Sequence, residues 1–272
     1  SVFLVDEDYK DEYILYYKTE AALEKAIRNN ALEVYYQPIH EPGGKMVALE
    51  ALCRIFDEEL GALRPDMFIT IAEQNGSIFK LTEQVLEKVC RFIVDNNINS
   101  WRLEHIGVNL SIMQFAQGRL SESIIKIINK YGIKPGILRF ELTETESASS
   151  LESVRNNMNI LIDKGFTFLL DDFGSGYANF SYLSELPFYC VKLDKSLLWN
   201  CDKERNSMST LFACAKIVKQ LGLLTVCEGV ETKEQVDLLQ GIGVNMLQGF
   251  YFSCALSEKR LIEYVSELEE AE

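Results

Sequence analysis

The sequence has little histidine: His40 and His105 are the only two among 272 residues. Zinc and non-haem iron centres in proteins are commonly built with several imidazole ligands. A histidine-rich metal centre is therefore excluded, and so is a mechanism in which histidine acts as the general base. A metal ion bound by this chain would need oxygen ligands from carboxylate and amide side chains.

Paired cysteines and long apolar runs are also lacking. The seven cysteines form no C-x2-C pair, and an odd number without that spacing favours reduced thiols over a disulfide framework. No apolar run approaches the ~18 residues of a membrane span, and the start, SVFLVDED, lacks the basic region of a secretory signal. We therefore expect a cytoplasmic location. Because the chain begins with Ser1, we also expect it to be a segment of a longer protein.

Positive charge is scarce relative to negative charge. The chain has 27 Lys and Arg against 41 Asp and Glu, a net charge of −14. A protein that binds duplex DNA by neutralising its phosphates has the opposite balance, so duplex nucleic acid is not an expected partner. An anionic substrate would need metal ions to offset the field of the protein.

Short apolar runs rich in β-forming residues alternate with longer segments whose apolar residues recur at intervals of three and four. Eight such runs favour a closed (β/α)8 barrel of the TIM type, an α/β fold with parallel strands. The alternative is a doubly wound open sheet. The predicted strands span residues 34–39, 47–54, 105–111, 138–142, 166–171, 190–194, 224–228 and 246–250.

The first 18 residues are acidic and rich in tyrosine, without a clear period. We interpret residues 1–18 as a linker or the tail of an upstream region, and residues 19–272 as the barrel domain. Thr19 is predicted to be the N-cap of a helix that begins at that point.

Two adjacent carboxylates, Asp171 and Asp172, lie in the run LLDDFGSG at residues 169–176. Neighbouring side chains in a strand point to opposite faces, so both can reach one site only where the strand ends. We therefore expect the pair at a boundary between strand and loop. Adjacent carboxylates repel unless a cation or a shared proton lies between them, which indicates a divalent metal site. The alternative is a simple turn in which Asp accepts backbone hydrogen bonds.

Polar residues interrupt or end nearly every other predicted strand. Taken singly, each is equally well explained as a buried ion pair or a surface group. Their recurrence instead indicates one site, because the carboxyl ends of parallel barrel strands meet at one mouth. Carboxylates and an amide oxygen suit Mg²⁺ or Mn²⁺, and a lysine among them suits an anionic substrate held by two ions. These residues are Glu50, Asn109, Glu141, Asp171, Asp172, Lys192, Asp194, Glu228 and Gln248.

Eight motifs follow one another along residues 20–256. They are YQPI at 36–39 with EALCR at 50–54, FITIAEQNGSI at 68–78, VNLS at 108–111, ELTE at 141–144, DDFGSGY at 171–177, KLD at 192–194, EGVET at 228–232 and QG at 248–249. Together they resemble the EAL domain family of bacterial cyclic-di-GMP phosphodiesterases. The resemblance implies a modified (β/α)8 barrel that hydrolyses cyclic di-(3′,5′)-GMP to linear 5′-pGpG with two Mg²⁺ or Mn²⁺ ions.

The resemblance also implies partners. A homodimer is expected, and the full-length protein is expected to carry an upstream sensor or GGDEF domain. Every metal and catalytic position holds the residue type of the family, which favours hydrolysis. The alternative is a receptor that binds cyclic di-GMP without cutting it.

Roles carry over to individual residues through the resemblance. One ion would be bound by Glu50, Asn109, Glu141 and Asp171, and Asp171 would bridge to a second ion bound by Asp172. Lys192 would contact the attacking water or the phosphate, and Glu228 would position or deprotonate that water. Glu144 would anchor the loop 173–180 at the dimer contact, where Ala178 and Asn179 replace a usual pair of serines. The implied substrate-binding residues are Gln37, Leu52, Arg54, Asp194, Glu231 and Gln248.

Overall fold

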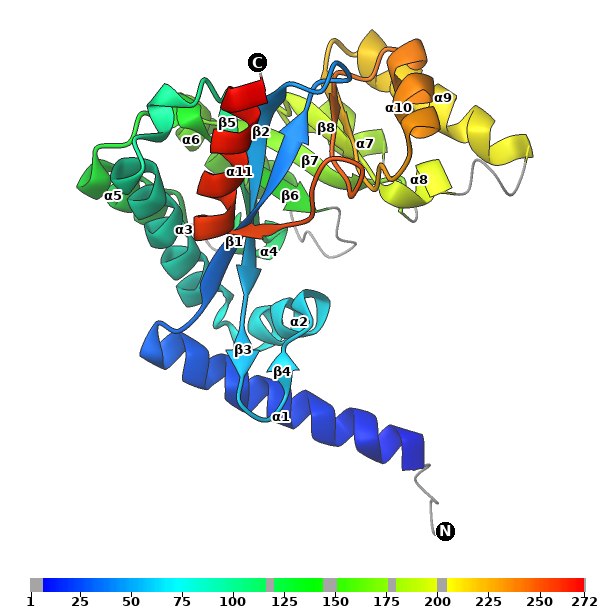
Figure 1. Cartoon of the computed structure of the whole chain (residues 1–272). Coiled ribbons are helices and arrows are strands. Elements are labelled where there is room, and N and C mark those ends of the chain that lie inside the picture. The colour runs from blue at the N-terminus through cyan, green and yellow to red at the C-terminus, as the bar shows by residue number, and fades with distance from the viewer. Residues whose placement is uncertain (1–6, 116–119, 144–150, 176–179, 200–204, 272) are drawn as a thin grey trace.

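The computed structural model describes residues 7–115, 120–143, 151–175, 180–199 and 205–271 (Figure 1). Within these residues, eight strands form a closed barrel, in which each strand is hydrogen-bonded to the next and the last returns to the first. The predicted barrel is confirmed, although its last strand is shorter than expected. The strands are β1 (Glu33–His40), β2 (Met46–Arg54), β5 (His105–Leu110), β6 (Leu138–Thr143), β7 (Thr167–Phe173), β8 (Cys190–Leu193), β9 (Leu224–Cys227) and β10 (Met246–Leu247).

The first strand departs from the parallel arrangement that the alternation predicted. β1 runs antiparallel to both of its barrel neighbours, β2 and β10, whereas the other neighbouring strands are parallel. The reason is the connection between β1 and β2, a short turn closed by Glu41 and Lys45 with Gly44 at φ +91°. Parallel strands need a crossover of a dozen or more residues, and this turn is too short to provide one.

Helices cover the outside of the barrel. The short strand β11 (Leu256–Ser257) pairs with Tyr35 and Tyr36 of β1, on the side opposite β2, before the last helix begins. Gly132, Gly165 and Gly222 have positive φ and lie just beyond three of the helices, as expected of residues that end a helix. The helices are α2 (Pro65–Asn75), α3 (Ile78–Asp95), α4 (Ile112–Phe115), α5 (Leu120–Tyr131), α6 (Leu151–Ile162), α7 (Phe180–Glu185), α8 (Lys195–Trp199), α9 (Arg205–Gln220), α10 (Lys233–Ile242) and α11 (Glu258–Ala271), with 3-10 turns η1 (Ile98–Ser100) and η2 (Pro135–Ile137).

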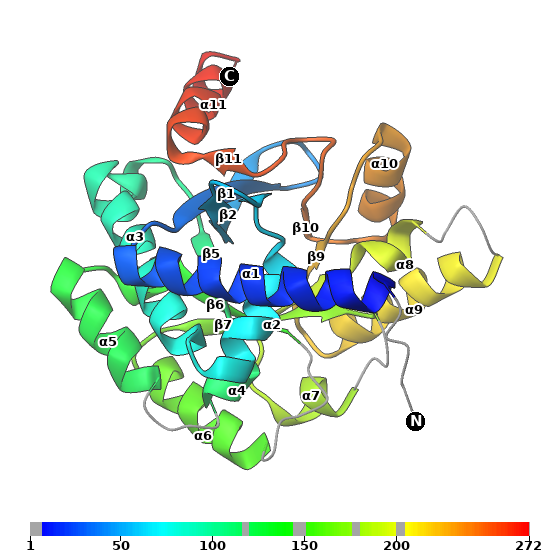
Figure 2. The ribbon, with the colours of Figure 1, turned by 90° about the horizontal axis from the view of Figure 1, so that it is seen from below.

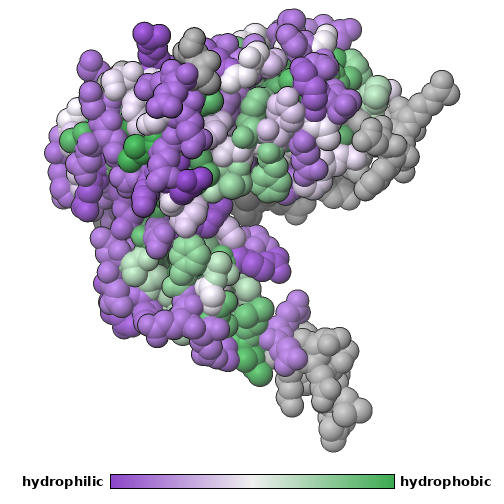
Figure 3. All heavy atoms as spheres, in the orientation of Figure 1, coloured by the Kyte–Doolittle hydropathy of each residue, from purple (hydrophilic) through white to green (hydrophobic). Residues whose placement is uncertain are grey.

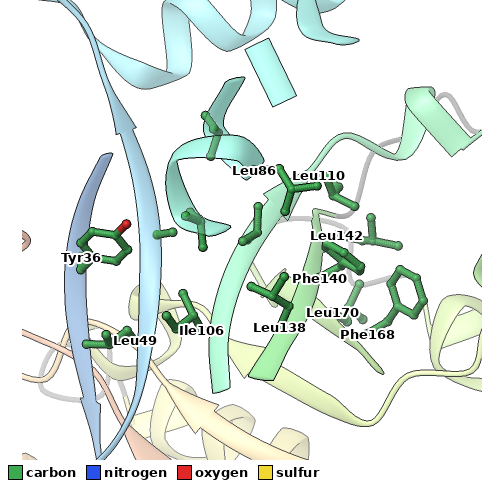
Figure 4. Close-up of a cluster of buried hydrophobic side chains, with 14 of the residues drawn as sticks. Tyr36, Leu49, Leu86, Ile106, Leu110, Leu138, Phe140, Leu142, Phe168 and Leu170 are labelled. Carbon is green, nitrogen blue, oxygen red and sulfur yellow. The ribbon is translucent and has the colours of Figure 1, made fainter. Parts of the chain in front are cut away.

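The main hydrophobic core lies between the strands and these helices. Leu138, Phe140 and Leu142 of β6 are buried there together with Phe168 and Leu170 of β7 (Figure 4). Their spacing of two residues is the period of a strand, so the residues between them face the interior of the barrel.

A smaller apolar cluster fills the interior of the barrel. It consists of Ile39, Val47, Ala48, Leu169, Cys190, Val226 and Met246. In five of the parallel strands, the second residue after a member of this cluster is polar. The interior therefore has an apolar layer and, nearer the carboxyl ends of the parallel strands, a polar layer. The five pairs are Ala48 and Glu50, Leu169 and Asp171, Cys190 and Lys192, Val226 and Glu228, and Met246 and Gln248.

Below the barrel, helix α1 (Glu7–Asn29) lies along α2 beside the small hairpin of β3 (Phe56–Asp57) and β4 (Gly61–Ala62) (Figures 1 and 2). Tyr16 donates to Gln74 of α2 at 2.8 Å, and Lys18 pairs with Glu59 at 2.5 Å. Figure 3 shows both hydrophilic and hydrophobic residues on this lobe, and a hollow between the lobe and the barrel. Within the described residues, no helix is long and apolar enough to cross a membrane.

The predicted helix start at Thr19 is wrong. α1 begins at Glu7, so Thr19 lies in its middle, where its buried hydroxyl contacts the sulfur of Met67 at 3.7 Å. The sequence pattern is misleading because residues 11–18 of α1 are exposed apart from the half-buried Tyr16, so the buried face of the helix begins only at Thr19. The helix has no break at residue 18, and the domain boundary between residues 18 and 19 stays a prediction.

The imidazole of His40 makes stability depend on pH. It is 1 % exposed, stacks on Phe252 at 4.4 Å, and lies 3.0 Å from the hydroxyl of Tyr264. Burial lowers the pKa of His40 to about 4. The unfolded chain, with a pKa near ~6.5, then binds the proton more readily than the folded one, so stability falls as pH decreases through the window between these values.

Between pH 7 and pH 5, protonation of His40 on unfolding should lower the free energy of unfolding of the wild type by about 2 kcal/mol. We expect His40→Gln to lack this part of the loss. Urea unfolding of both proteins at the two pH values measures this difference. Equal losses in the variant and the wild type would contradict the assignment.

Candidate active site

A single ammonium group lies at the centre of the polar layer. Lys192 of β8 is fully buried, and its Nζ is surrounded by carboxylates from four segments of the barrel. Burial alone would lower the pKa of Lys192, but these carboxylates raise it well above its ordinary value, so the group stays charged. The distances from Nζ are 3.1 Å to Glu50 Oε2, 2.6 Å to Glu141 Oε2, 3.0 Å to Asp171 Oδ1 and 2.7 Å to Glu228 Oε1.

Amide side chains fix the carboxylate of Glu50. Asn109 of β5 donates to Glu50 Oε1 at 2.8 Å, and Gln248 donates to Glu50 Oε2 at 2.7 Å. The Gln248 amide nitrogen also lies 3.2 Å from Oε1 of Gln37 on β1. Burial raises the pKa of Glu50, but Lys192 and the two amide donors outweigh it, so the pKa is lowered and the group is held as a carboxylate.

Asp171 and Asp172 converge by a different route from the one predicted. β7 does not end at Asp171 but continues to Phe173. The register with β8 shifts between Leu170 and Phe173, which is a bulge, and Asp172 has φ +54°. A bulge re-aims side chains, and Asp is one of the few residues that tolerate this left-handed conformation. The strained backbone, rather than a strand end, brings both carboxylates to the mouth.

The described carboxylates form two groups that suit cations. Glu50, Glu141 and Asp171 offer oxygens within 4.8 Å of one another, and so do Asp171, Asp172 and Glu228. Asp171 belongs to both groups. Burial raises the pKa of Glu141 to about 8, with repulsion from Glu50 adding to the rise and Lys192 opposing it. One lysine therefore does not neutralise this mouth.

Two buried oxygens at the mouth support the fit to a cation. Glu141 Oε1 and Gln248 Oε1 are buried acceptors without a hydrogen-bond partner among the described residues. Such atoms are costly to bury unless a donor or a cation meets them. Carboxylate and amide oxygens are the ligands of hard divalent cations such as Mg²⁺ and Mn²⁺, so the donor set fits the predicted ions.

Gly107 is a site residue that the sequence analysis missed. It lies on β5 directly beside Glu50, and the side chain of Glu141 fills the space that a side chain at residue 107 would occupy. A Cβ at this position would lie 1.8 Å from Glu141 Oε1. The signal in the sequence was a glycine inside an apolar strand, which marks close approach by a neighbouring group.

A cavity of about 240 Å³ opens beside the carboxylates. Four of the predicted substrate-binding residues line it: Gln37, Leu52, Glu231 and Gln248. Lys195, Trp199 and Phe250 line it too, although no motif in the sequence indicated them.

The two remaining predicted substrate residues lie elsewhere. Arg54 lines a neighbouring cavity of about 140 Å³ that shares Leu52 with the first, and its guanidinium donates to the carbonyl of Cys53 at 2.9 Å. Asp194 lines neither cavity, and its Oδ1 accepts from the backbone N–H of Ser196 at 2.9 Å, at the start of α8. The predicted loop anchor, Glu144, lies outside the described residues, as do residues 176–179 of its loop.

Curated proteins of known name match most of the chain. The oxygen sensor protein DosP of Escherichia coli is 33% identical over 247 residues, which cover 90% of this chain and 31% of DosP. The cyclic di-GMP phosphodiesterase PdeL of Escherichia coli is 31% identical over 244 residues, covering 89% of this chain and 67% of PdeL. The chain thus spans about a third of the length of relatives such as DosP.

Solved structures show the same fold. A structure described as the PaMucR phosphodiesterase in complex with c-di-GMP superposes with a TM-score of 0.83 at 29% identity, covering 90% of this chain and 99% of that one. The EAL domain matches residues 20–255, in agreement with the motifs that indicated it. With this match over most of its length, the chain belongs to the EAL domain family.

Proposed function

We propose that the chain is a divalent-metal-dependent phosphodiesterase that hydrolyses one phosphodiester of cyclic di-(3′,5′)-GMP to linear 5′-pGpG. The observation that carries the proposal is that Asp171, which pairs with Lys192, belongs to both carboxylate groups at the mouth. Relatives named as cyclic di-GMP phosphodiesterases and the PaMucR complex support the substrate class.

The proposed ions are two Mg²⁺ or Mn²⁺. Glu50, Asn109, Glu141 and Asp171 would hold one, and Asp171 and Asp172 would hold the other. Bound divalent cations of this kind acidify water and neutralise the charge of a phosphoryl group.

The side chains around the ions perform the remaining steps. Glu228 is the carboxylate at Lys192 that solvent reaches most easily, with 18% of its side chain exposed against 9% or less for the others. Glu228 would orient the attacking water and accept its proton while the water oxygen bonds to phosphorus. The bond from phosphorus to the 3′ oxygen breaks, and that oxygen takes up a proton. Lys192 would contribute positive charge beside the phosphate.

The cavity residues would hold the substrate. Gln37, Leu52, Glu231 and Gln248 would line the groove, and Arg54 would bind a phosphate oxygen once its guanidinium turns from Cys53. The role of Asp194 in the groove rests on the resemblance, because its described contact is with α8. A homodimer and an upstream sensor or GGDEF domain remain part of the proposal.

Incubation with cyclic di-GMP and Mg²⁺ or Mn²⁺, followed by chromatography, tests the proposal. We expect pGpG that disappears with chelator and in Glu50→Ala. We expect Glu228→Gln to lower kcat by a factor of roughly 10²–10⁴, because the water loses its proton acceptor.

Glu234→Gln is the matched control, since Glu234 is an exposed acid in the first turn of α10. It should hydrolyse at the wild-type rate. Tight binding of cyclic di-GMP by the wild type without product would favour the receptor, and absence of binding would overturn both functions.

We expect Gly107→Ala to abolish metal-dependent hydrolysis, because the added methyl group displaces the Glu141 carboxylate. The variant should also lose the rise in melting temperature that Mn²⁺ gives the wild type, since stabilisation follows occupancy of the site. Gly136→Ala is the control, because a Cβ at Gly136 meets no atom within 4 Å. Undiminished stabilisation of Gly107→Ala by Mn²⁺ would contradict the assigned ligand position of Glu141.

A further inference from the structure

The segment 228–231, between β9 and α10, must hold the most exposed of the four carboxylates at Lys192. Because burial restrains Glu228 least, its position depends on the backbone of this segment. Three backbone hydrogen bonds fix the segment at Glu228 and at Val230. Glu228 N–H donates to the Leu193 carbonyl at 3.0 Å, Val230 N–H donates to the Gln248 carbonyl at 3.1 Å, and the Val230 carbonyl accepts from Tyr251 N–H at 2.9 Å.

Between Glu228 and Val230 the backbone turns at Gly229. Its φ is +68°, in the left-handed region, and its carbonyl accepts a hydrogen bond from Trp199 Nε1 at 2.8 Å. A Cβ at Gly229 would lie 2.4 Å from the Cβ of Lys195 and 3.1 Å from Trp199 Nε1. α8 therefore packs directly on the bare backbone next to Glu228.

α8 is itself joined to the strand that carries Lys192. It begins two residues after Leu193, and Asp194 fixes its first turn by accepting from Ser196 N–H. The ammonium of Lys195 lies over the indole of Trp199, 5.4 Å from the ring centroid. Trp199 thus links a helix attached to β8 with the segment that carries Glu228.

We propose that Trp199 is a positioning residue for Glu228, an inference that rests on the proposed function. By holding the carbonyl of Gly229, the indole N–H keeps the left-handed turn at that residue. This turn sets the direction in which the Glu228 side chain leaves the backbone, and so its distance to Lys192, which is 2.7 Å in the structure.

Trp199→Phe removes the donor while it keeps an aromatic ring in the cavity. We expect kcat for cyclic di-GMP to fall by a factor of roughly 5, the usual effect of one lost hydrogen bond, with KM within about twofold and a melting temperature lowered by no more than about 4 °C. The control is Trp101→Phe, because Trp101 packs on Phe92 and lines neither cavity at the mouth. A wild-type kcat in Trp199→Phe, or a change confined to KM, would overturn the inference.

A double-mutant cycle tests whether the effect passes through Glu228. In a Glu228→Gln background there is no carboxylate to position, so we expect Trp199→Phe to change kcat by less than about twofold. A further fivefold fall in that background would show that Trp199 acts on another group, and would overturn the inference.

Amide hydrogen exchange gives a readout that needs no activity. In the free protein, we expect the amides of residues 228–231 to exchange roughly tenfold faster in Trp199→Phe than in the wild type, with no change in Trp101→Phe. Equal rates in the wild type and Trp199→Phe would overturn the inference whether or not the wild type hydrolyses cyclic di-GMP. Faster exchange in Trp199→Phe would support the inference even if the wild type did not hydrolyse cyclic di-GMP. That lack of hydrolysis would count against the proposed function alone.

Discussion

The buried ammonium of Lys192 is the charge on which the mouth of the barrel depends. An unpaired ammonium in a protein interior costs several kcal/mol, and adjacent carboxylates without a cation repel one another. In this fold, the carboxylates stabilise the buried ammonium and the ammonium reduces the repulsion between them, because four carboxylates lie 2.6–3.1 Å from one lysine. The balance is incomplete, since the acids outnumber the lysine. The mouth must therefore take up protons, as the raised pKa of Glu141 shows, or cations, and this suits it to divalent cations.

The two-residue period of the strands is what lets one barrel hold both a stable core and this charged mouth. Leu169 and Asp171 point the same way, one step of about 6.6 Å apart, so apolar packing and ligand oxygens occupy successive layers of the same strand. The intervening residues, such as Leu170, face the helices. Substitutions in the polar layer therefore alter the chemistry of the mouth. The apolar layer inside the barrel and the main core under the helices keep the barrel closed.

Much of this arrangement could be predicted from the sequence, because strand periodicity and acids at strand ends are local patterns. The antiparallel β1 was missed although its cause, the short turn ending at Lys45, is also local. The bulge at Asp172 was beyond prediction, because nothing in an Asp-Asp pair specifies a positive φ. Gly107 and Trp199 were missed for another reason: each matters through a contact with a residue distant in sequence, Glu141 and Gly229.

The charge of the mouth also bears on the choice between hydrolysis and simple binding. Cyclic di-GMP carries two phosphodiester anions, and a mouth with several buried carboxylates repels an anion unless cations lie between them. A pocket that only held the dinucleotide would bind it better with fewer acids, because each removed carboxylate reduces both repulsion and desolvation cost. Glu50, Glu141, Asp171 and Glu228 all converge on Lys192 here. The presence of all four favours hydrolysis over simple binding, because hydrolysis needs both cations and an activated water.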